Sequence, residues 1–419
     1  MARLRSVWLG WLPKLDYQVW LLAVGRLLSQ LGSGFTLFYA PIFFVNEVGL
    51  SATAVGIGLG SQAVTGVVGR FFGGSWADGW LGRKRTLLLA TVISAIAAFT
   101  LASIQTFTGL IIGSLFVGLG MGLYWPAAEA LIADLTTAEE RNEAYALNRL
   151  ADGLGLGLGV VLGGVLIGTT GAYRALFVID GVSFLVFFAL VAQAIAEQHK
   201  PAQTHTLWQG WGVALRDRAL LVFCVVNTLL TTYIVQISST LPLYLNNFVL
   251  ADLGFPPKTL SLIISGLFTW HLAATVLTQM PVAKRLNRLS RVQALRVSAG
   301  LWAIGFISIW VAGVAPRGHL GLTGLALGIL ALATVTYMPS ATAIVVDMAP
   351  ESLRGVYLAV NSQCWAIGYF VGPPLGGWAL DQGAGMAHGF WLGLAASVAV
   401  AIAILQRLGQ MLHRQKSSL

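Results

Sequence analysis

Long apolar segments fill most of this chain, and they limit its fold more than any other feature. An α-helix needs about 20 apolar residues to cross a bilayer. Hydrophobic residues make up 57% of the 419 residues and charged residues only 10%, against about 25% charged residues in an average soluble domain. This composition excludes the soluble, disulfide-stabilised and disordered classes and predicts a polytopic membrane protein.

Twelve segments are long and apolar enough to cross a membrane. They are 17–45, 53–76, 86–105, 107–134, 142–168, 175–196, 219–248, 259–282, 292–314, 320–347, 355–380 and 389–408. We therefore predict an all-α membrane protein with 12 transmembrane helices in two pseudo-symmetric halves of six.

A polar stretch divides the predicted spans into two equal sets. We expect residues 1–196 to form the N-terminal half, 197–218 a cytoplasmic linker and 219–419 the C-terminal half. If the N-terminus is inside, cytoplasmic segments hold 18 of the 25 Lys and Arg residues, counting Arg407 at the inner end of the last span, which predicts that both termini are cytoplasmic. Because the basic residues are dispersed, they do not form a nucleic-acid-binding face. The first residues lack the apolar core and cleavage site of a signal peptide and are expected to lead into the first span.

The two halves share an internal repeat. A shift of 213 residues aligns 124–164 with 337–377, and 13 of the 41 positions are identical. Two like halves in parallel orientation place a substrate site at their interface, reached by rocking of one half against the other. The sequence thus predicts a transporter with alternating access.

The loop after the second span contains the stretch GSWADGWLGRKR, residues 74–85. With this stretch the chain resembles the major facilitator superfamily, although Gly79 stands where the usual signature has a basic residue. The resemblance implies that Asp78 latches the cytoplasmic side by facing a helix N-terminus; the alternative is that the basic residues only anchor topology. The gating residues expected from this loop and from the repeat are Asp78, Arg83, Lys84, Arg85, Asp134, Arg141, Asp347 and Arg354.

Two glycine-rich patterns, in the fifth and eleventh spans, resemble the antiporter motif of drug:proton exporters. Regularly spaced glycines let helices approach closely, and a proline permits bending. The residues are Gly155, Gly159, Gly163, Gly164, Gly368, Gly372, Pro373, Gly376 and Gly377. They serve either as a packing ridge alone or also as a hinge. Within the superfamily the chain most resembles bacterial multidrug exporters, which implies a location in the bacterial inner membrane.

Charged residues inside spans are functional candidates because their burial is costly. Glu129, Arg149 and Asp152 have uncharged residues at the repeat-equivalent positions, so packing symmetry does not require them. We expect Arg26 to face Glu129 across the cavity, and Arg149 and Asp152 to neutralise each other on one helix face. Glu129, or failing it Asp152, is the candidate proton carrier. The alternative is an ion network that only holds the N-terminal half together.

Two further charges are expected to have lesser roles. Asp180 lies near the outer end of the sixth span, where it can reach Arg174 or water, and we interpret it as structural. Arg70 lies two turns above Asp78, and its long side chain can reach the inner interface.

Aromatic residues are frequent in the spans that line the cavity in this superfamily. The candidates are Phe38, Tyr39, Tyr124, Trp125, Tyr233 and Tyr337. Aromatic walls suit amphipathic or cationic compounds, although helix packing accounts for such residues too. We expect a monomer that exports hydrophobic or amphipathic small molecules against protons in the lipid bilayer. The alternative is a facilitator or proton symporter of a small solute or lipid-like metabolite. The sequence shows no cofactor-binding motif, metal cluster or nucleophile–base pair, so an enzyme is not expected.

Overall fold

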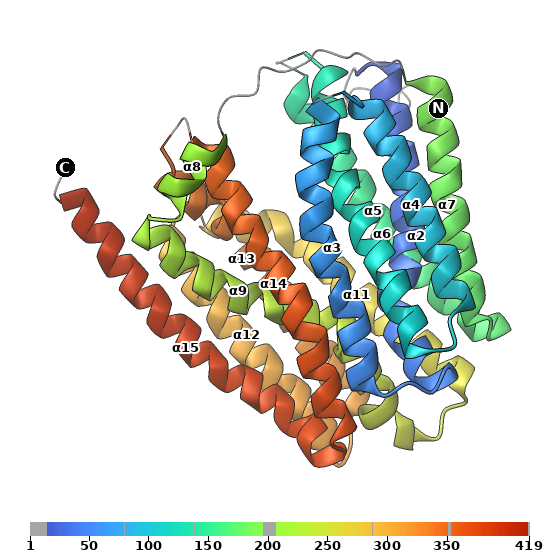
Figure 1. The fold of residues 1–419 in the computed structure, drawn as a ribbon. Helices are drawn as coiled ribbons and strands as arrows, with labels where there is room; N and C mark the ends of the chain where they lie inside the picture. The colour runs from blue at the N-terminus through green and yellow to red at the C-terminus, as the bar shows by residue number, and fades with distance from the viewer. Residues whose placement is uncertain are drawn as a thin grey trace, which may run out of the picture.

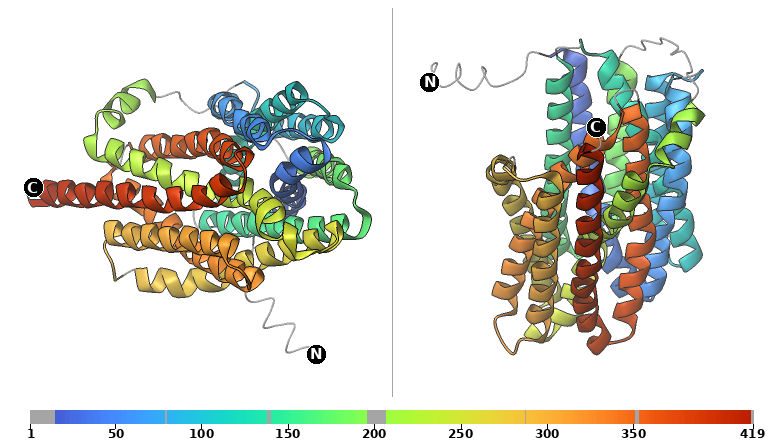
Figure 2. Two further views of the ribbon diagram at one scale, coloured as in Figure 1. Left: turned by 90° about the horizontal axis from the view of Figure 1, so that it is seen from below. Right: turned by 90° about the vertical axis from the view of Figure 1, so that its left-hand side faces the viewer.

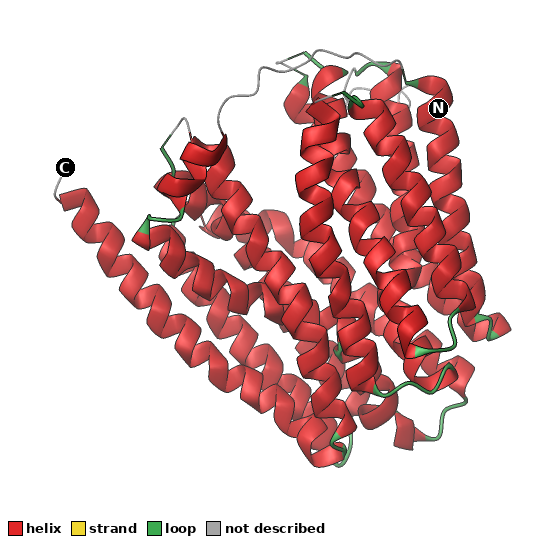
Figure 3. Cartoon of the chain, in the orientation of Figure 1, coloured by secondary structure: helices red, strands yellow, loops and turns green. Residues whose placement is uncertain are grey.

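The structure is a computed structural model that describes residues 15–78, 80–137, 140–195, 207–286, 288–350 and 353–417. The described residues are almost entirely helical (Figure 3). The first bundle contains α2 (Tyr17–Ile42), η1 (Phe43–Glu47), α3 (Ala52–Asp78), α4 (Arg83–Ser103), α5 (Phe107–Asp134), α6 (Arg141–Thr170) and α7 (Tyr173–Ala194).

A second bundle follows a short helix, α8 (Leu207–Ala214). Its helices are α9 (Arg218–Ser239), α10 (Leu241–Tyr244), η2 (Leu245–Val249), η3 (Ala251–Leu253), α11 (Pro257–Leu286), α12 (Arg291–Val314), α13 (His319–Met348), α14 (Arg354–Asp381) and α15 (Ala384–Ser417). Figure 1 shows the first bundle upright beside the inclined helices of the second, and Figure 2 shows the same arrangement from below and from the side.

The predicted fold class is confirmed. Among the described residues, 11 helices are long and apolar enough to cross a membrane, and the 28-residue helix α14 packs beside α3 and α9 as the twelfth long helix. The division of the chain at 197–218 stays a prediction, because 196–206 lies outside the described residues. The remainder of that stretch includes α8 and ends where α9 begins.

Local sequence signals set the helix ends. Asp16, Thr106 and Asp217 are N-caps whose side chains accept backbone N–H groups at the starts of α2, α5 and α9. Gly171 ends α6 in the left-handed conformation with φ of 74°, which glycine adopts without steric cost. The chain can therefore reverse directly into α7.

Glycines bring α2 and α6 into backbone contact. A Cβ on Gly159 would lie 2.2 Å from the carbonyl oxygen of Leu31 and 3.0 Å from Cα of Gly34. A Cβ on Gly155 would lie 2.4 Å from the carbonyl oxygen of Leu27. These positions admit no side chain, so the first half of the predicted ridge is a close helix–helix contact.

The glycines of α14 pack in the same way against helices of both bundles. A Cβ on Gly376 would collide with the Thr240 side chain, and one on Gly377 would lie 2.1 Å from the carbonyl oxygen of Ala52 in α3. The amide of Gln236 donates to the carbonyl oxygen of Gly372 at 2.9 Å, next to Pro373. The contact of α14 with α3 joins the two bundles, as does that of α6 with α11.

The two bundles are tied together at the end opposite α8, which we call the far end. Asn46 and Asn247, which lie in η1 and η2, exchange two side-chain hydrogen bonds of 3.1 Å. The Lys258 ammonium donates to the carbonyl oxygen of Thr169 at 3.2 Å, and the Tyr39 hydroxyl bonds Ser265. Toward the α8 end the helices of the two bundles diverge (Figure 1).

Candidate functional site

A buried ion network lies inside the first bundle. The Arg26 guanidinium on α2 is 0% exposed. Its Nε donates to Asp152 Oδ1 on α6 at 2.9 Å, and its Nη2 pairs with Asp152 Oδ2. Glu129 on α5 completes the network, with Oε1 3.7 Å from Arg26 Nη2. One buried cation thus has two carboxylates from different helices around it.

The network is unevenly exposed. The side chain of Glu129 is 31% exposed and that of Asp152 is 14% exposed. Removing either carboxylate partner would leave Arg26 buried with less counter-charge, which is costly. Glu129 is thus the more accessible of the two carboxylates, and Asp152 is the closer partner of Arg26.

The expected pairing of Arg149 with Asp152 is wrong. Arg149 lies on the exposed side of α6, whereas Asp152 turns toward α2 and pairs with Arg26. The two residues are close in sequence, but a fully buried guanidinium needs a counter-charge more than an exposed one does. Arg149 is therefore outside the network formed by Arg26, Asp152 and Glu129.

A cavity of about 350 Å³ lies in the first bundle, and α9 and α14 of the second bundle contribute to its wall. Trp125 lines this cavity. The Arg26 guanidinium carbon lies 5.3 Å from the Trp125 ring centre and 5.9 Å from that of Tyr124, within the range of cation–π attraction. The Trp125 ring therefore connects the cavity to the buried ion network.

Most of the aromatic residues proposed for the cavity wall lie elsewhere, and that expectation needs correction. Only Trp125 of the six is among the residues that line the cavity. Phe38 packs against Phe268 with ring centres 4.3 Å apart, and the Tyr337 hydroxyl donates to Asn227 at 2.6 Å. Tyr39 bonds the carbonyl oxygen of Val160. The remaining two, Tyr124 and Tyr233, are likewise buried in helix packing. These five rings pack in helix interfaces, where most of the tyrosine hydroxyls are hydrogen-bonded. The rings therefore do not reach the cavity.

Asp180 and Arg70 are also placed differently from the expectation. Both line the cavity. Asp180 is 4% exposed and accepts a hydrogen bond from the Thr36 hydroxyl at 2.5 Å. Arg174 turns away and donates instead to the carbonyl oxygen of Ala102 at 2.6 Å. One guanidinium nitrogen of Arg70, Nη1, is buried rather than extended to the membrane interface.

Four of the expected gating residues make contacts at the α8 end within their own bundle: Arg83, Lys84, Asp134 and Asp347. Arg83 at the start of α4 pairs with Asp134 at the end of α5. In the second bundle, Arg291 at the start of α12 lies 3.5 Å from Asp347 at the end of α13. Lys84 donates to the carbonyl oxygen of Ala192 at 2.9 Å. Arg85 is described, while the side chains of Asp78, Arg141 and Arg354 lie outside the described structure.

A carboxylate from the second bundle caps a helix of the first at the far end. Asp381, the last residue of α14, accepts the backbone N–H groups of Ala52 and Thr53 at 2.8 and 2.7 Å and also the Thr53 hydroxyl. A carboxylate at a helix N-terminus accepts hydrogen bonds from the free N–H groups of the helix and interacts favourably with the helix dipole. Sequence reasoning missed this contact because its partners are far apart in the chain.

Replacing Asp381 with alanine should weaken closure of the far end by about 1–2 kcal/mol, because the first N–H groups of α3 lose their acceptor. The expected result is a longer distance between spin labels at Thr170 and Phe255, measured by double electron–electron resonance. Asp217→Ala is the matched control, since Asp217 caps α9 within one bundle. An unchanged distance distribution in Asp381→Ala would contradict the prediction.

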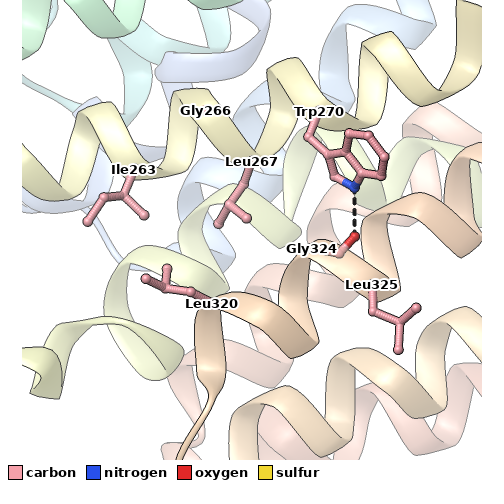
Figure 4. Close-up of a pocket in the computed structure, with 7 residues that line it drawn as sticks. All are labelled: Ile263, Gly266, Leu267, Trp270, Leu320, Gly324 and Leu325. Carbon is pink, nitrogen blue, oxygen red and sulfur yellow. Dashed lines mark hydrogen bonds between the residues drawn. The ribbon is translucent and has the colours of Figure 1, made fainter.

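A second hollow, of about 530 Å³, lies between α11 and α13 (Figure 4). Its wall is apolar, and the indole N–H of Trp270 donates to the carbonyl oxygen of Gly324 at 2.8 Å. Trp270 and Leu325 are exposed and face the surroundings of the bundle. This hollow has no charged group and is not the candidate site.

Among the described residues, no group of three or more His, Cys, Asp or Glu side chains is arranged to hold a metal ion. The arrangement is that of two helical bundles around a cavity with a mostly apolar wall, which includes Arg70 and Asp180, and with a charge network behind Trp125.

Comparisons with known proteins agree with this architecture. The chain is 24% identical over 348 residues to the multidrug resistance protein MdtH of Photorhabdus laumondii, covering 82% of this chain and 81% of that one. It is 24% identical over 370 residues to a Na(+), Li(+), K(+)/H(+) antiporter of Planococcus maritimus, covering 81% and 85%.

Solved structures share the fold. A crystal structure of the nucleoside transporter NupG superposes with a TM-score of 0.75 at 14% identity, covering 94% of this chain and 99% of that one. An inward-facing, unoccupied bacterial homologue of the lysosomal transporter Spinster gives a TM-score of 0.77 at 15% identity, covering 94% and 96%. The family model described as Major Facilitator Superfamily matches residues 22–250 and 238–416. The chain is therefore a transporter rather than an enzyme, and it belongs to the Major Facilitator Superfamily.

Proposed function

We propose that this protein exports hydrophobic or amphipathic small molecules across the bacterial inner membrane in exchange for protons. The observation that carries the proposal is the buried Arg26, held by Asp152 and Glu129 and stacked on a cavity-lining tryptophan. The names of the relatives, a multidrug resistance protein and a cation/proton antiporter, support the same class of activity. The protein is proposed to act as a monomer. Both termini are proposed to lie in the cytoplasm, because the basic residues concentrate on that side of the predicted spans.

Coupling follows because a proton and the Arg26 guanidinium compete for the same carboxylates, those of Asp152 and Glu129. When Glu129 or Asp152 takes up a proton, Arg26 loses part of its counter-charge, and an unpaired buried cation is costly. The guanidinium then shifts relative to the Trp125 ring, which lies against it on one side and lines the cavity on the other. A change in protonation thereby alters the position of Arg26 against Trp125, a residue of the cavity wall that would contact the cargo.

The described conformation fits one end state of an alternating-access cycle. The far end is closed by contacts between the bundles, among them those of Asp381 and Asn46, and the helices diverge toward the cytoplasmic α8 end. Rocking requires these far-end bonds to break while the backbone contacts within each bundle persist. α2 and α6 pack together within one bundle, so we expect these two helices to move together during rocking.

Reconstituted vesicles with an imposed pH gradient test the proposal. In vesicles with the cytoplasmic side outward, an acidic lumen should drive uptake of an amphipathic dye by wild-type protein. Glu129→Gln should abolish this gradient-driven uptake and preserve dye binding, because the carboxylate is lost while the cavity keeps its shape. Co-movement of substrate and protons in one direction would instead support the alternative, a proton symporter, and downhill movement unaffected by pH would support a facilitator.

Trp125→Ala should lower gradient-driven uptake about tenfold or more, because a desolvated cation–π contact is worth up to about 2 kcal/mol. Trp125→Phe should retain part of the activity, since a smaller ring remains. The measurement is initial uptake rate at equal protein content. Trp270→Ala, in the hollow between α11 and α13, is the control and should leave the rate unchanged; equal rates for both alanine variants would argue against the link between ring and network.

A further inference from the structure

Two opposite charges without an ionic partner line the same cavity. Asp180 on α7 has one oxygen, Oδ1, that is buried and has no hydrogen-bond partner among the described residues. Arg70 on α3 has a buried nitrogen, Nη1, in the same situation. Of the residues that line the cavity, only these two are acidic or strongly basic: one carboxyl group and one guanidinium. Neither belongs to the Arg26 network.

The two charges lie at different depths of the cavity. Gly181, next to Asp180, packs against Phe99 of α4, whereas Arg70 packs against Gly122 of α5. Ser94 of α4 lies beside Gly120, which sets the register between α4 and α5. Counted along these two helices at 1.5 Å per residue, the backbone positions of the two residues differ in depth by roughly 10 Å. Among the described residues, no ion pair joins the two side chains.

Neutral donors and apolar side chains form the rest of the cavity wall. The hydroxyls of Ser94 and Ser114 line the cavity, are buried and have no partner among the described residues. The remaining wall includes Phe184, Val117 and Trp125. The cavity therefore has a carboxyl group toward the far end, a guanidinium toward the α8 end, and an otherwise largely apolar wall with two unpartnered serine hydroxyls among the described residues.

Each charge alone is expensive, because a buried ion needs a counter-charge or hydrogen bonds. A cargo with a single positive charge would satisfy Asp180 and leave Arg70 unmatched; a single negative charge would do the reverse. Only a compound with both charges satisfies both groups at once. Each charged hydrogen bond of this kind strengthens binding about tenfold or more.

We propose that the cavity selects zwitterionic amphipathic compounds, with the cationic group at Asp180 and Thr36 and the anionic group at Arg70. The assignment of these compounds as cargo rests on the proposed export function, whereas their binding does not. The chemical class is an ω-amino acid or a similar dipolar molecule whose charges are roughly 10 Å apart, joined by an apolar body.

Calorimetric titration of the purified full-length protein in lipid nanodiscs tests the proposal with three probes. They are an ω-amino fatty acid with that charge spacing, the alkylamine of equal length and the fatty acid of equal length. Wild-type protein should bind the zwitterion about tenfold or more tightly than either singly charged probe. Equal affinities for the three probes would overturn the proposal, with no variant needed.

Charge-neutral variants then assign each end. Asp180→Asn should weaken binding of the zwitterion and the amine about tenfold and leave binding of the fatty acid unchanged. Arg70→Gln should weaken binding of the zwitterion and the fatty acid about tenfold and leave binding of the amine unchanged. Glu47→Gln and Arg317→Gln neutralise exposed charges away from the cavity and should change nothing. A zwitterion affinity unchanged in Asp180→Asn would overturn the assignment.

The binding test is separable from the test of export. Charge-selective binding without pH-driven uptake would contradict the proposed function alone. pH-driven uptake with binding that ignores ligand charge would contradict the zwitterion site alone.

Discussion

Replacing Asp152 with asparagine should abolish pH-gradient-driven uptake and lower the free energy of unfolding by about 3–5 kcal/mol. Asp152 makes both close contacts to the fully buried Arg26 guanidinium, whereas Glu129 is 3.7 Å away. Removing the bidentate partner leaves a buried cation with one distant counter-charge. Thermal or denaturant unfolding in detergent measures the stability, and vesicle uptake measures the coupling.

The double variant Arg26→Gln with Asp152→Asn separates stability from coupling. Removing both charges also removes the unpaired ion, so most of the lost stability should return. Uptake driven by the gradient should stay absent, because Glu129 remains but Arg26, the group through which a carboxylate acts on Trp125, is gone. Full gradient-driven uptake in the double variant would show that the network is only structural, the alternative left open by the sequence.

Gly159→Val should lower the free energy of unfolding by about 1–3 kcal/mol and reduce transport in proportion to the folded fraction. Its Cβ would lie 2.2 Å from the Leu31 carbonyl oxygen and 3.0 Å from Cα of Gly34. Both neighbours are backbone, so only a shift of α2 against α6 relieves the collision. Unfolding midpoints in detergent check the result.

Gly153→Val is the matched control on the same helix. A Cβ at Gly153 meets nothing within 4 Å, and glycine is a poor helix former, so this substitution should be neutral or slightly stabilising. Equal destabilisation in the two variants would mean that the cost arises from helix propensity and not from the crossing with α2.

The fold followed from the sequence because its signals are local or periodic. Apolar length predicts each span by itself, and the repeat predicts that two similar bundles follow one another. The glycines of α6 indicate close packing because spacing along one helix is enough to define a smooth face. Which helix covers that face is set by tertiary structure, and the contact with α2 appears only there.

The candidate site was predicted less well, because side-chain direction is not visible in a single sequence. Asp152 was expected to pair with Arg149, its neighbour on the same helix, and it pairs with Arg26 instead. Tyr337 and Phe38 were expected in the cavity and are buried in helix contacts. The positions of Asp180 and Arg70 along their spans predict a structural role and a side chain that reaches the inner interface, yet both residues line the cavity. The helix face they share depends on packing across several helices.

The reciprocal amide contact between Asn46 and Asn247 is made by uncharged groups. Each side chain donates one hydrogen bond and accepts one, both of 3.1 Å. The two residues lie in the π-helical segments η1 and η2, which follow α2 and α10. An amide side chain does not titrate, so this contact keeps the same strength over the pH range in which a carboxylate changes charge. In the proposed proton-driven cycle, the signal that opens this contact must therefore reach the far end from elsewhere in the molecule.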